Sequence, residues 1–209
     1  VYKSKREGQS VGIDVGLNSF AVDSDGAVIE NPRFYEHSLG RIKKIQRSLA
    51  RKKRFSKNWK KAKRKLEKVY DHVTNQKNDF LHKLSRQYVD TYATICVEDL
   101  NIKYLKENGK SRGLRRSIHS ASWGRFYSYL SYKAESAGTE LVKVDPRDTT
   151  QMCSNCGSIV KKTLSERVHA CPYCGFAADR DCNAAVNIHR GGWNSPSGLW
   201  SLDLCITSP

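Results

Sequence analysis

Four of the seven cysteines in this 209-residue chain fall into two close pairs. Cys153 and Cys156 form the first pair and Cys171 and Cys174 the second, with two residues inside each pair and fourteen between the pairs. This spacing is typical of two knuckles that each present two thiolates to one tetrahedral zinc ion. Because four thiolates fill the coordination shell and leave no position for a water molecule, we predict a structural rather than a catalytic zinc site.

The residues around these pairs agree with a metal site. Gly157 and Gly175 each follow the second cysteine of a pair, where the chain must turn tightly. The alternative is a pair of disulfides. It is the weaker interpretation, because the cysteine count is odd and Cys96, Cys182 and Cys205 are scattered along the chain.

Three acidic residues stand where a carboxylate is costly unless it has a partner. Asp14 lies inside an apolar segment, Glu98 ends a second apolar segment, and Asp181 begins the last helical pattern. If the two segments are neighbouring strands and the helix packs across them, the three acids meet at one site. Oxygen ligands of this kind suit Mg2+, and two such ions would support hydrolysis of a phosphodiester. Taken singly, each acid also has an ordinary interpretation, as a helix cap for Asp181 or a solvated strand end for Glu98.

The elements that would position these side chains are predicted from the spacing of apolar residues. Residues 10–30 alternate as strands do and predict an antiparallel meander with a turn at Asp25-Gly26. Residues 39–92 change to a helical period and predict a long hairpin of helices, broken near Phe55-Ser56. Residues 94–97 form a short apolar run that predicts one buried strand.

The second half of the chain gives a similar succession of signals. Residues 106–117 are polar and basic and predict a mobile loop, after which Ser122 is expected to cap a helix that Gly138 ends. Residues 141–144 predict another strand, and residues 183–189 a closing helix. The tail from Gly191 onward is rich in Gly, Ser and Pro, and we predict no stable fold for it.

Charge indicates the class of partner. The 37 Lys and Arg exceed the 21 Asp and Glu, which gives a formal net charge of +16 and favours a nucleic acid over a membrane surface. No run approaches the roughly 18 apolar residues of a membrane span, and the N-terminus lacks the apolar core of a signal peptide. We therefore expect no membrane partner and a cytoplasmic location.

Most of this charge lies in one stretch of the predicted hairpin. Residues 41–68 hold fifteen Lys and Arg and a single acid, Glu67. A phosphate backbone is the partner that this density favours over an ordinary solvated helix. Phe55 and Trp59 could stack on bases, although Trp59 also fits the apolar stripe and is interpreted as a core residue. The predicted nucleic-acid contacts are Arg41, Lys44, Arg47, Arg51, Lys52, Lys53, Arg54, Lys57, Lys60, Lys61 and Arg64.

Four motifs in one order resemble a known family. They are GIDVGLNSFAV, VEDL, VDPRDTTQMCSNCG and CPYCGFAADRDCNAAVNI, and together they resemble the RuvC-type nuclease core of the TnpB family, long called OrfB transposases. These are RNA-guided nucleases of insertion sequences, and they are similar to compact type V CRISPR effectors. The resemblance covers roughly residues 10–190.

The resemblance implies an α/β, RNase H-like fold. Its mixed sheet with flanking helices would carry the basic helical hairpin after the first three strands and a small zinc-ribbon insertion. On this division, residues 1–38, 93–148 and 179–190 form the three parts of the RuvC-like core, and residues 39–92 form the hairpin. Residues 149–178 form the zinc ribbon, which would bind target nucleic acid, and residues 191–209 a flexible tail.

The resemblance also implies chemistry and partners. Asp14, Glu98 and Asp181 match the catalytic ligands of two Mg2+ or Mn2+ ions that cut DNA under the direction of a guide RNA. Asp179, Arg180 and Asp99 are second-rank candidates. Asp179 is the rival of Asp181 and ranks below it because the family's DRD motif assigns the ligand to its last acid, and Asp99 is a lesser rival of Glu98. The sequence departs from the family at Asp148 and Thr150 and lacks the N-terminal lobe that grips guide and target.

Two functions therefore remain at this stage. The first is a metal-dependent DNA endonuclease core. The alternative is a non-catalytic remnant or domesticated derivative that binds DNA or RNA through its zinc ribbon and basic hairpin without cutting. The chain begins at Val1 rather than Met, a few residues before the first predicted strand, which is consistent with a missing N-terminal portion. The three retained acids favour the endonuclease.

Overall fold

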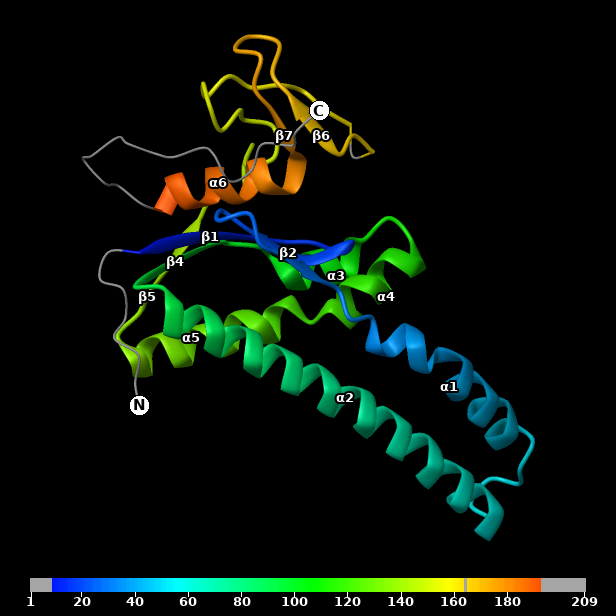
Figure 1. Ribbon diagram of the computed structural model, residues 1–209. Coiled ribbons are helices and arrows are strands. Elements are labelled where there is room, and N and C mark those ends of the chain that lie inside the picture. Colours follow the sequence, from blue (N-terminus) through cyan, green and yellow to red (C-terminus); the bar gives the residue numbers. More distant parts are fainter. Residues whose placement is uncertain (1–8, 164, 193–209) are drawn as a thin grey trace. The chain divides into compact units, whose positions relative to one another are not determined.

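A five-stranded mixed sheet organises the computed structural model, which describes residues 9–163 and 165–192 (Figure 1). The predicted meander of residues 10–30 is confirmed, since the first three strands are antiparallel neighbours. The strands lie in the order β3-β2-β1-β4-β5, and β4 pairs in parallel with both β1 and β5. Their bounds are β1 Ser10–Val15, β2 Ser19–Asp23, β3 Val28–Glu30, β4 Thr94–Glu98 and β5 Glu140–Val144.

Both faces of the sheet centre are covered, as its apolar sequence requires. Every residue of β4 is buried, which is typical of a central parallel strand between two layers of helices. Helix α6 (Arg180–Gly192) lies over one face, while helix α5 (Trp123–Ala137) and the last turns of α2 lie over the other (Figure 1). On that second face, the rings of Phe20 and Phe126 pack edge to face with centroids 5.4 Å apart.

Helix α6 approaches the sheet so closely that one position of β1 must lack a side chain. A Cβ atom on Gly12 would overlap the carbonyl oxygen of Ala185 and lie 2.5 Å from the amide nitrogen of His189. Near the other end of the helix, a Cβ on Gly192 would lie 2.5 Å from the Cys96 sulfur in β4. Glycine at both positions therefore allows the helix backbone to lie directly on β1 and β4.

The basic hairpin forms its own compact unit, residues 32–84, and residues 1–31 and 85–209 belong to a second unit. Helices α1 (Phe34–Ala50) and α2 (Lys57–Thr91) flank a break at residues 51–56, where the sequence predicts it. Within this unit, the rings of Phe34 and Phe80 lie 6.2 Å apart, and the Gln46 amide donates to the Tyr70 hydroxyl at 3.2 Å. The two helices therefore pack antiparallel through a narrow apolar stripe.

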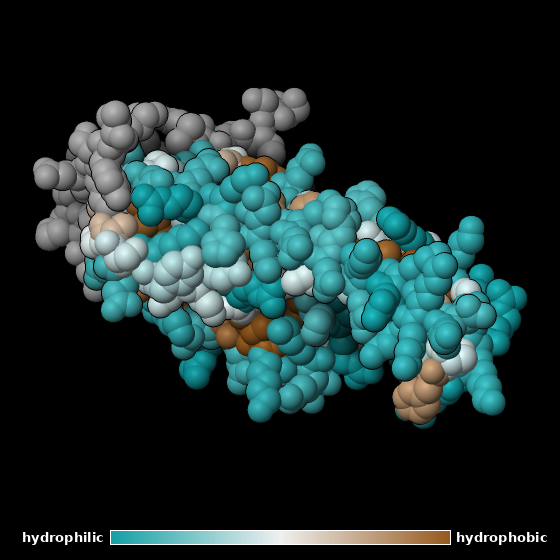
Figure 2. All heavy atoms as spheres, turned by 90° about the horizontal axis from the view of Figure 1, so that it is seen from below, coloured by the Kyte–Doolittle hydropathy of each residue, from teal (hydrophilic) through white to brown (hydrophobic). Residues whose placement is uncertain are grey.

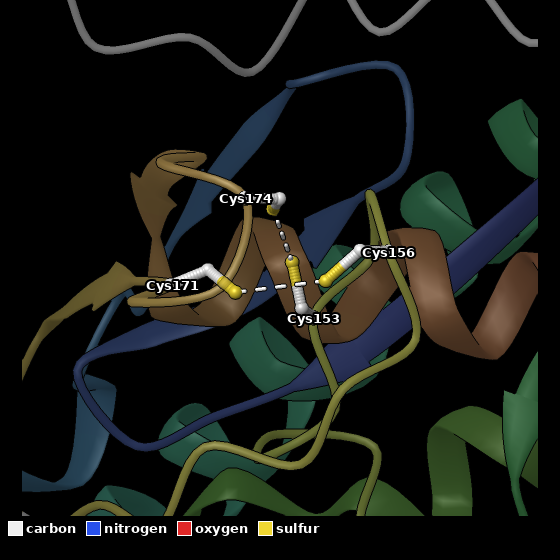
Figure 3. Close-up of side chains that lie close together, drawn as sticks. All are labelled: Cys153, Cys156, Cys171 and Cys174. Atoms are coloured by element: carbon white, nitrogen blue, oxygen red, sulfur yellow. Dashed lines mark hydrogen bonds between the residues drawn. The ribbon is translucent and has the colours of Figure 1, made fainter.

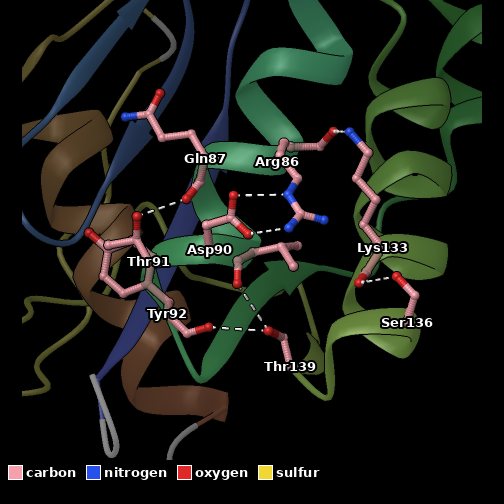
Figure 4. Close-up of polar contacts among 10 residues, drawn as sticks. Arg86, Gln87, Asp90, Thr91, Tyr92, Lys133, Ser136 and Thr139 are labelled. Atoms are coloured by element: carbon pink, nitrogen blue, oxygen red, sulfur yellow. Dashed lines mark hydrogen bonds and ion pairs between the residues drawn. The ribbon is translucent and has the colours of Figure 1, made fainter. Parts of the chain in front are cut away.

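Polar contacts join the last turns of α2 to α5 and to Thr139, which lies between α5 and β5 (Figure 4). The Lys133 ammonium, which is buried, donates to the Ser85 hydroxyl at 2.8 Å, and the Thr139 hydroxyl lies 3.2 Å from the carbonyl of Val89. Arg86 and Asp90 add an ion pair at 2.8 Å along the helix surface. These contacts hold the last turns of α2 against α5 and Thr139.

Two predictions for the middle of the chain need correction. The predicted loop at residues 106–117 is wrong, because Asn101 and Ser111 cap two short helices, α3 (Ile102–Asn108) and α4 (Arg112–Ala121). Ser122 precedes α5 as predicted, yet its hydroxyl does not cap α5 and instead donates to the His119 and Ser120 carbonyls at the end of α4, and its φ of 61° is left-handed. Gly138 ends α5 as predicted, with a φ of 63°.

The described chain ends with a small second sheet and α6. Strands β6 (Val168–Ala170) and β7 (Ala177–Asp179) form a hairpin, and α6 starts at residue 180 and runs to residue 192, further at both ends than the predicted 183–189. The predicted unfolded tail otherwise lies outside the described residues. None of the helices in the described part of the chain has both the length and the apolar composition that a membrane crossing requires. Figure 2 shows a face on which hydrophilic residues dominate and hydrophobic ones form separate spots.

We expect Gly12→Ala to destabilise the protein by at least about 3 kcal/mol, because the new methyl group overlaps the α6 backbone. For a chain of this size the loss corresponds to roughly 6–12 °C in Tm, measured by circular dichroism. Gly40→Ala is the matched control, since nothing lies within 4 Å of a Cβ at this helical position, and it should be neutral or stabilising. An unchanged Tm in Gly12→Ala would contradict the close approach of α6.

Candidate functional site

The structure places Asp14 and Glu98 at the same end of two neighbouring parallel strands. The β1–β4 register pairs Gly12 with Cys96 and Ile13 with Val97, so its next step sets Asp14 beside Glu98. Successive side chains in a strand alternate between faces, and both acids therefore share the face of Gly12 and Cys96. That is the face that α6 covers.

Helix α6 brings the third acid to this pair. His189 of α6 lies beside Ser10, and Ala185 lies over Gly12. Asp181 is in the first turn of α6, one helical turn before Ala185 and toward the Val15 end of β1. The helix thus runs antiparallel to β1 and sets Asp181 near the strand ends that carry the other two acids.

The pKa of Asp14 responds to the other two acids. Burial raises its pKa well above the usual value, and repulsion from Glu98 and then from Asp181 raises it further. Burial likewise raises the pKa of Glu98, and burial together with Asp179 raises that of Asp181. The acids nevertheless do not meet in one ion's coordination shell. Within residues 9–163 and 165–192, only a group of cysteines has all its donor atoms within 4.8 Å of one another.

The second-rank acids have other partners. Asp179 caps α6, since its Oδ1 accepts hydrogen bonds from the amides of Asp181 and Cys182 at 2.8 and 3.1 Å. Asp99 is exposed and pairs with Lys143 at 3.1 Å. The cap is therefore Asp179 and not Asp181, which leaves the Asp181 side chain available to the site.

Arg180 bonds the segment that precedes β6. Its guanidinium donates to the carbonyls of Thr163 and Glu166 at 3.4 Å, and its amide donates to the Arg167 carbonyl at 2.7 Å. These contacts give Arg180 a structural role at the base of the β6–β7 hairpin.

Two residues that sequence reasoning missed contact the acids directly. The Thr149 hydroxyl donates to a Glu98 oxygen at 2.5 Å, and both side chains are buried. Arg167 reaches Asp181, with its Nη1 at 3.7 Å from Oδ2. The motif DTTQMC contains Thr149, but residue type alone gives no signal that links this hydroxyl to a carboxylate fifty-one positions away.

The four predicted zinc ligands come together from two loops (Figure 3). The Cys153 and Cys174 sulfurs lie 3.7 Å apart, and those of Cys156 and Cys171 lie 3.6 Å apart. A tetrahedral ion with Zn–S bonds of about 2.3 Å separates its sulfurs by about 3.8 Å. The cluster therefore has the dimensions of a possible zinc-binding site.

The two loops repeat one backbone design. In each, the amide of the first cysteine donates to the carbonyl five residues later, and the following glycine donates back to that cysteine. Gly157 and Gly175 have φ values of 76° and 74°, so the prediction of tight glycine turns is confirmed. Burial raises the pKa of the Cys153 thiol to about 12, whereas contacts with Ser158 lower that of Cys156 to about 6. A bound cation would favour the thiolate form at all four positions.

A polar stripe on α6 holds the first cysteine loop in place. Asn183 and Asn187 are buried one turn apart, and both amides donate to the Met152 carbonyl, at 2.8 and 2.7 Å. The Asn187 amide also lies 2.8 Å from the Thr149 carbonyl, while the Ser154 amide donates to Asn183 at 2.9 Å. One helix thus supports Asp181, the Thr149 backbone and the residues on both sides of Cys153.

The basic hairpin presents its charge outward. Of the eleven predicted nucleic-acid contacts, all are exposed except Lys52, which is half-buried. Between α1 and α2 lies a cavity of about 490 Å³ whose lining contains no acid. Its polar walls are Lys44, Lys52, Lys61, Lys65, Ser48 and Asn58. Such a lining suits an anion, because the lysines repel one another without a counter-charge.

Family models match two parts of the chain. Residues 2–109 match OrfB_IS605, described as a probable transposase, and residues 123–188 match the Cas12f1-like TNB domain. The first match covers slightly more than half of the chain. The second includes the four cysteines, Thr149 and most of α6.

Relatives that match most of this chain agree with these family matches. The chain is 40% identical over 185 residues to a "Putative RNA-guided DNA endonuclease" of Streptomyces pristinaespiralis, covering 88% of this chain and 45% of the relative. It is 34% identical over 204 residues to TnpB-like protein L79 of Acanthamoeba polyphaga mimivirus, covering 91% and 39%. The chain therefore spans less than half the length of these relatives.

The fold also has a solved counterpart. A chain in the cryo-EM structure of a CRISPR-Cas12f ternary complex matches with a TM-score of 0.65 at 21% identity, covering 90% of this chain and 40% of that one. At this identity the match shows the fold alone. The mixed sheet and its helices are accordingly those of a Cas12f-like core.

We expect the purified chain to carry one zinc ion and Cys171→Ser to lose it, because three thiolates hold the ion less tightly than four. Zinc per chain would be measured by inductively coupled plasma mass spectrometry. Cys96→Ala is the control, since this buried cysteine lies outside the cluster and its loss should leave the zinc content unchanged. Full zinc content in Cys171→Ser would exclude the four-cysteine site.

Proposed function

The chain belongs to the OrfB_IS605 family of probable transposases, and from this membership we propose that it is the catalytic core of a TnpB-type RNA-guided DNA endonuclease. The arrangement that supports the proposal is that Asp14 and Glu98 lie beside each other on neighbouring parallel strands and that Asp181 is in the first turn of the helix over them. Relatives named as RNA-guided DNA endonucleases, and their match across most of this chain, support the same activity. The mixed sheet with helices on both faces supports an RNase H-like, RuvC-type core.

The three acids are the proposed ligands of divalent metal ions. Their oxygens are the donors that Mg2+ and Mn2+ prefer, and their raised pKa values reflect the burial and repulsion that a cation would relieve. A pair of such ions would supply the activated water and stabilise the leaving oxygen of the phosphodiester. Within the chain, Thr149 orients Glu98 and the Asp179 cap frees Asp181.

The remaining parts of the chain would hold nucleic acid around these acids. The zinc ion would be structural, fixing the two cysteine loops that α6 supports. The basic hairpin would bind the phosphate backbone of guide RNA or target DNA. Because the chain spans less than half of its relatives, sequence choice and full activity would require the remainder of such a protein and its guide.

We expect Asp14→Asn to raise the Tm of the chain in Mg2+-free buffer while it abolishes stabilisation by Mg2+. The substitution removes a buried charge that two neighbouring acids repel. Removing such a charge typically raises the free energy of unfolding by about 1 kcal/mol, which corresponds to about 2–4 °C in Tm for a chain of this size. Mg2+ should raise the Tm of the wild-type chain only, because the variant lacks a ligand. In a full-length protein with its guide, the same variant should lose DNA cleavage.

Asp99→Asn is the control for this comparison. Its carboxylate is exposed and paired with Lys143, so its loss should leave the Mg2+-dependent rise in Tm intact. Equal stabilisation of the wild type and Asp14→Asn by Mg2+ would remove the proposed metal site. The chain would then be better described as a nucleic-acid-binding module without catalysis.

For the hairpin, we expect the triple variant Lys44→Gln, Lys52→Gln and Lys61→Gln to bind single-stranded DNA more weakly and with a smaller salt dependence. Each lost phosphate contact lowers the slope of log K against log salt by about 0.7, so three would lower it by about 2. Fluorescence anisotropy at several salt concentrations measures both quantities.

The matched control removes three cations that already have an acidic partner. Lys63, Lys83 and Lys143 pair with Glu67, Asp79 and Asp99 at 3.4, 2.7 and 3.1 Å. Their replacement by Gln removes the same charge and should change the slope less. If both triple variants flatten the slope equally, the cavity between α1 and α2 has no special part in binding.

A further inference from the structure

An aromatic side chain stands exposed at the tip of the basic hairpin. Phe55 is 65% exposed, in a turn whose two ends are fixed by hydrogen bonds from the Lys52 amide to Leu49 and from the Ser56 amide to Lys53. Its φ of 66° is left-handed, a conformation that costs a bulky side chain energy and is rare outside glycine. The turn thus retains an exposed Phe where Gly would fit without strain.

Trp59 lies behind Phe55 and extends the aromatic surface. The two ring centroids are 5.5 Å apart and tilted by 57°, and the Ser56 hydroxyl accepts from the Trp59 amide at the start of α2. Trp59 is half-buried rather than a core residue, so the interpretation of this side chain as core is wrong.

Cations flank both rings. The Arg54 guanidinium lies 5.0 Å from the centroid of Phe55, and the Lys63 ammonium lies 5.8 Å from that of Trp59. The two tilted rings and the cations that lie over them offer an apolar surface together with contacts for phosphate. This combination is the one used where single strands are held by stacking.

We propose that Phe55 and Trp59 form a stacking platform for unpaired bases of a nucleic-acid strand whose phosphates lie along the hairpin. The proposal rests on the proposed function and adds a base contact to its phosphate contacts. The fifteen Lys and Arg of residues 41–68 favour a polyanion as the occupant over an apolar protein segment. The flat rings select unpaired bases, because paired bases in a duplex present no free face.

The test compares two single strands of equal length and charge. One is oligo(dT), and the other is an abasic strand with the same phosphates and no bases. With the 209-residue chain, Phe55→Ala should lower affinity for oligo(dT) by at least about fivefold and leave affinity for the abasic strand unchanged. Phe55→Tyr keeps a ring and should restore binding. The salt slope should be that of the wild type in both variants, because no charge is removed.

Tyr104→Ala is the control, since this side chain is 60% exposed on α3 and lies outside the hairpin. It should leave both affinities unchanged. Equal losses on the two strands in Phe55→Ala, or no loss on oligo(dT), would overturn the platform. Binding of the abasic strand by the wild-type chain tests the phosphate contacts separately, so failure of the platform and failure of the hairpin as a nucleic-acid interface give different results.

Discussion

The direct contact between the backbone of α6 and the sheet is the constraint on which the rest of the core depends. It exists because Gly12 and Gly192 have no side chains, so the helix lies on β1 and β4 without an intervening layer. At that distance, the direction of the helix is fixed by backbone atoms rather than by adaptable side chains. Asp181 therefore keeps one position relative to the strand ends that carry Asp14 and Glu98.

The same helix connects the cysteine cluster to the acids by a route that chain distance does not indicate. Cys174 lies only seven residues before Asp181, which suggests that zinc positions this acid. The contacts favour a different path. The side-chain amides of Asn183 and Asn187 in α6 donate to the Met152 and Thr149 carbonyls, and the Thr149 hydroxyl donates to Glu98. In this arrangement the first cysteine loop influences the position of Glu98, which lies on strand β4.

Local signals explain what the sequence predicts well. The cysteine spacing, the meander and the break in the hairpin each depend on a few neighbouring residues, and each is confirmed. The sequence does not predict the short helices α3 and α4, because their polar and basic composition is typical of a loop. Their capping residues, Asn101 and Ser111, nevertheless stabilise the helix starts. Asp179 caps α6, whereas Asp181 lies in its first turn. The two acids are of the same residue type, so the sequence alone does not show which of them is the cap.

The hairpin shows how strongly charge density constrains a structure that must also fold. Its cations repel one another along two helices, and among its described residues only Lys63–Glu67 is an ion pair within positions 41–68. Repulsion of this kind raises the free energy of the folded hairpin, and a bound polyanion lowers it again. Binding and folding of this unit are therefore thermodynamically linked, since any ligand that favours the folded form stabilises it. A unit that is most stable when a polyanion is bound fits the nucleic-acid-binding role proposed for this hairpin.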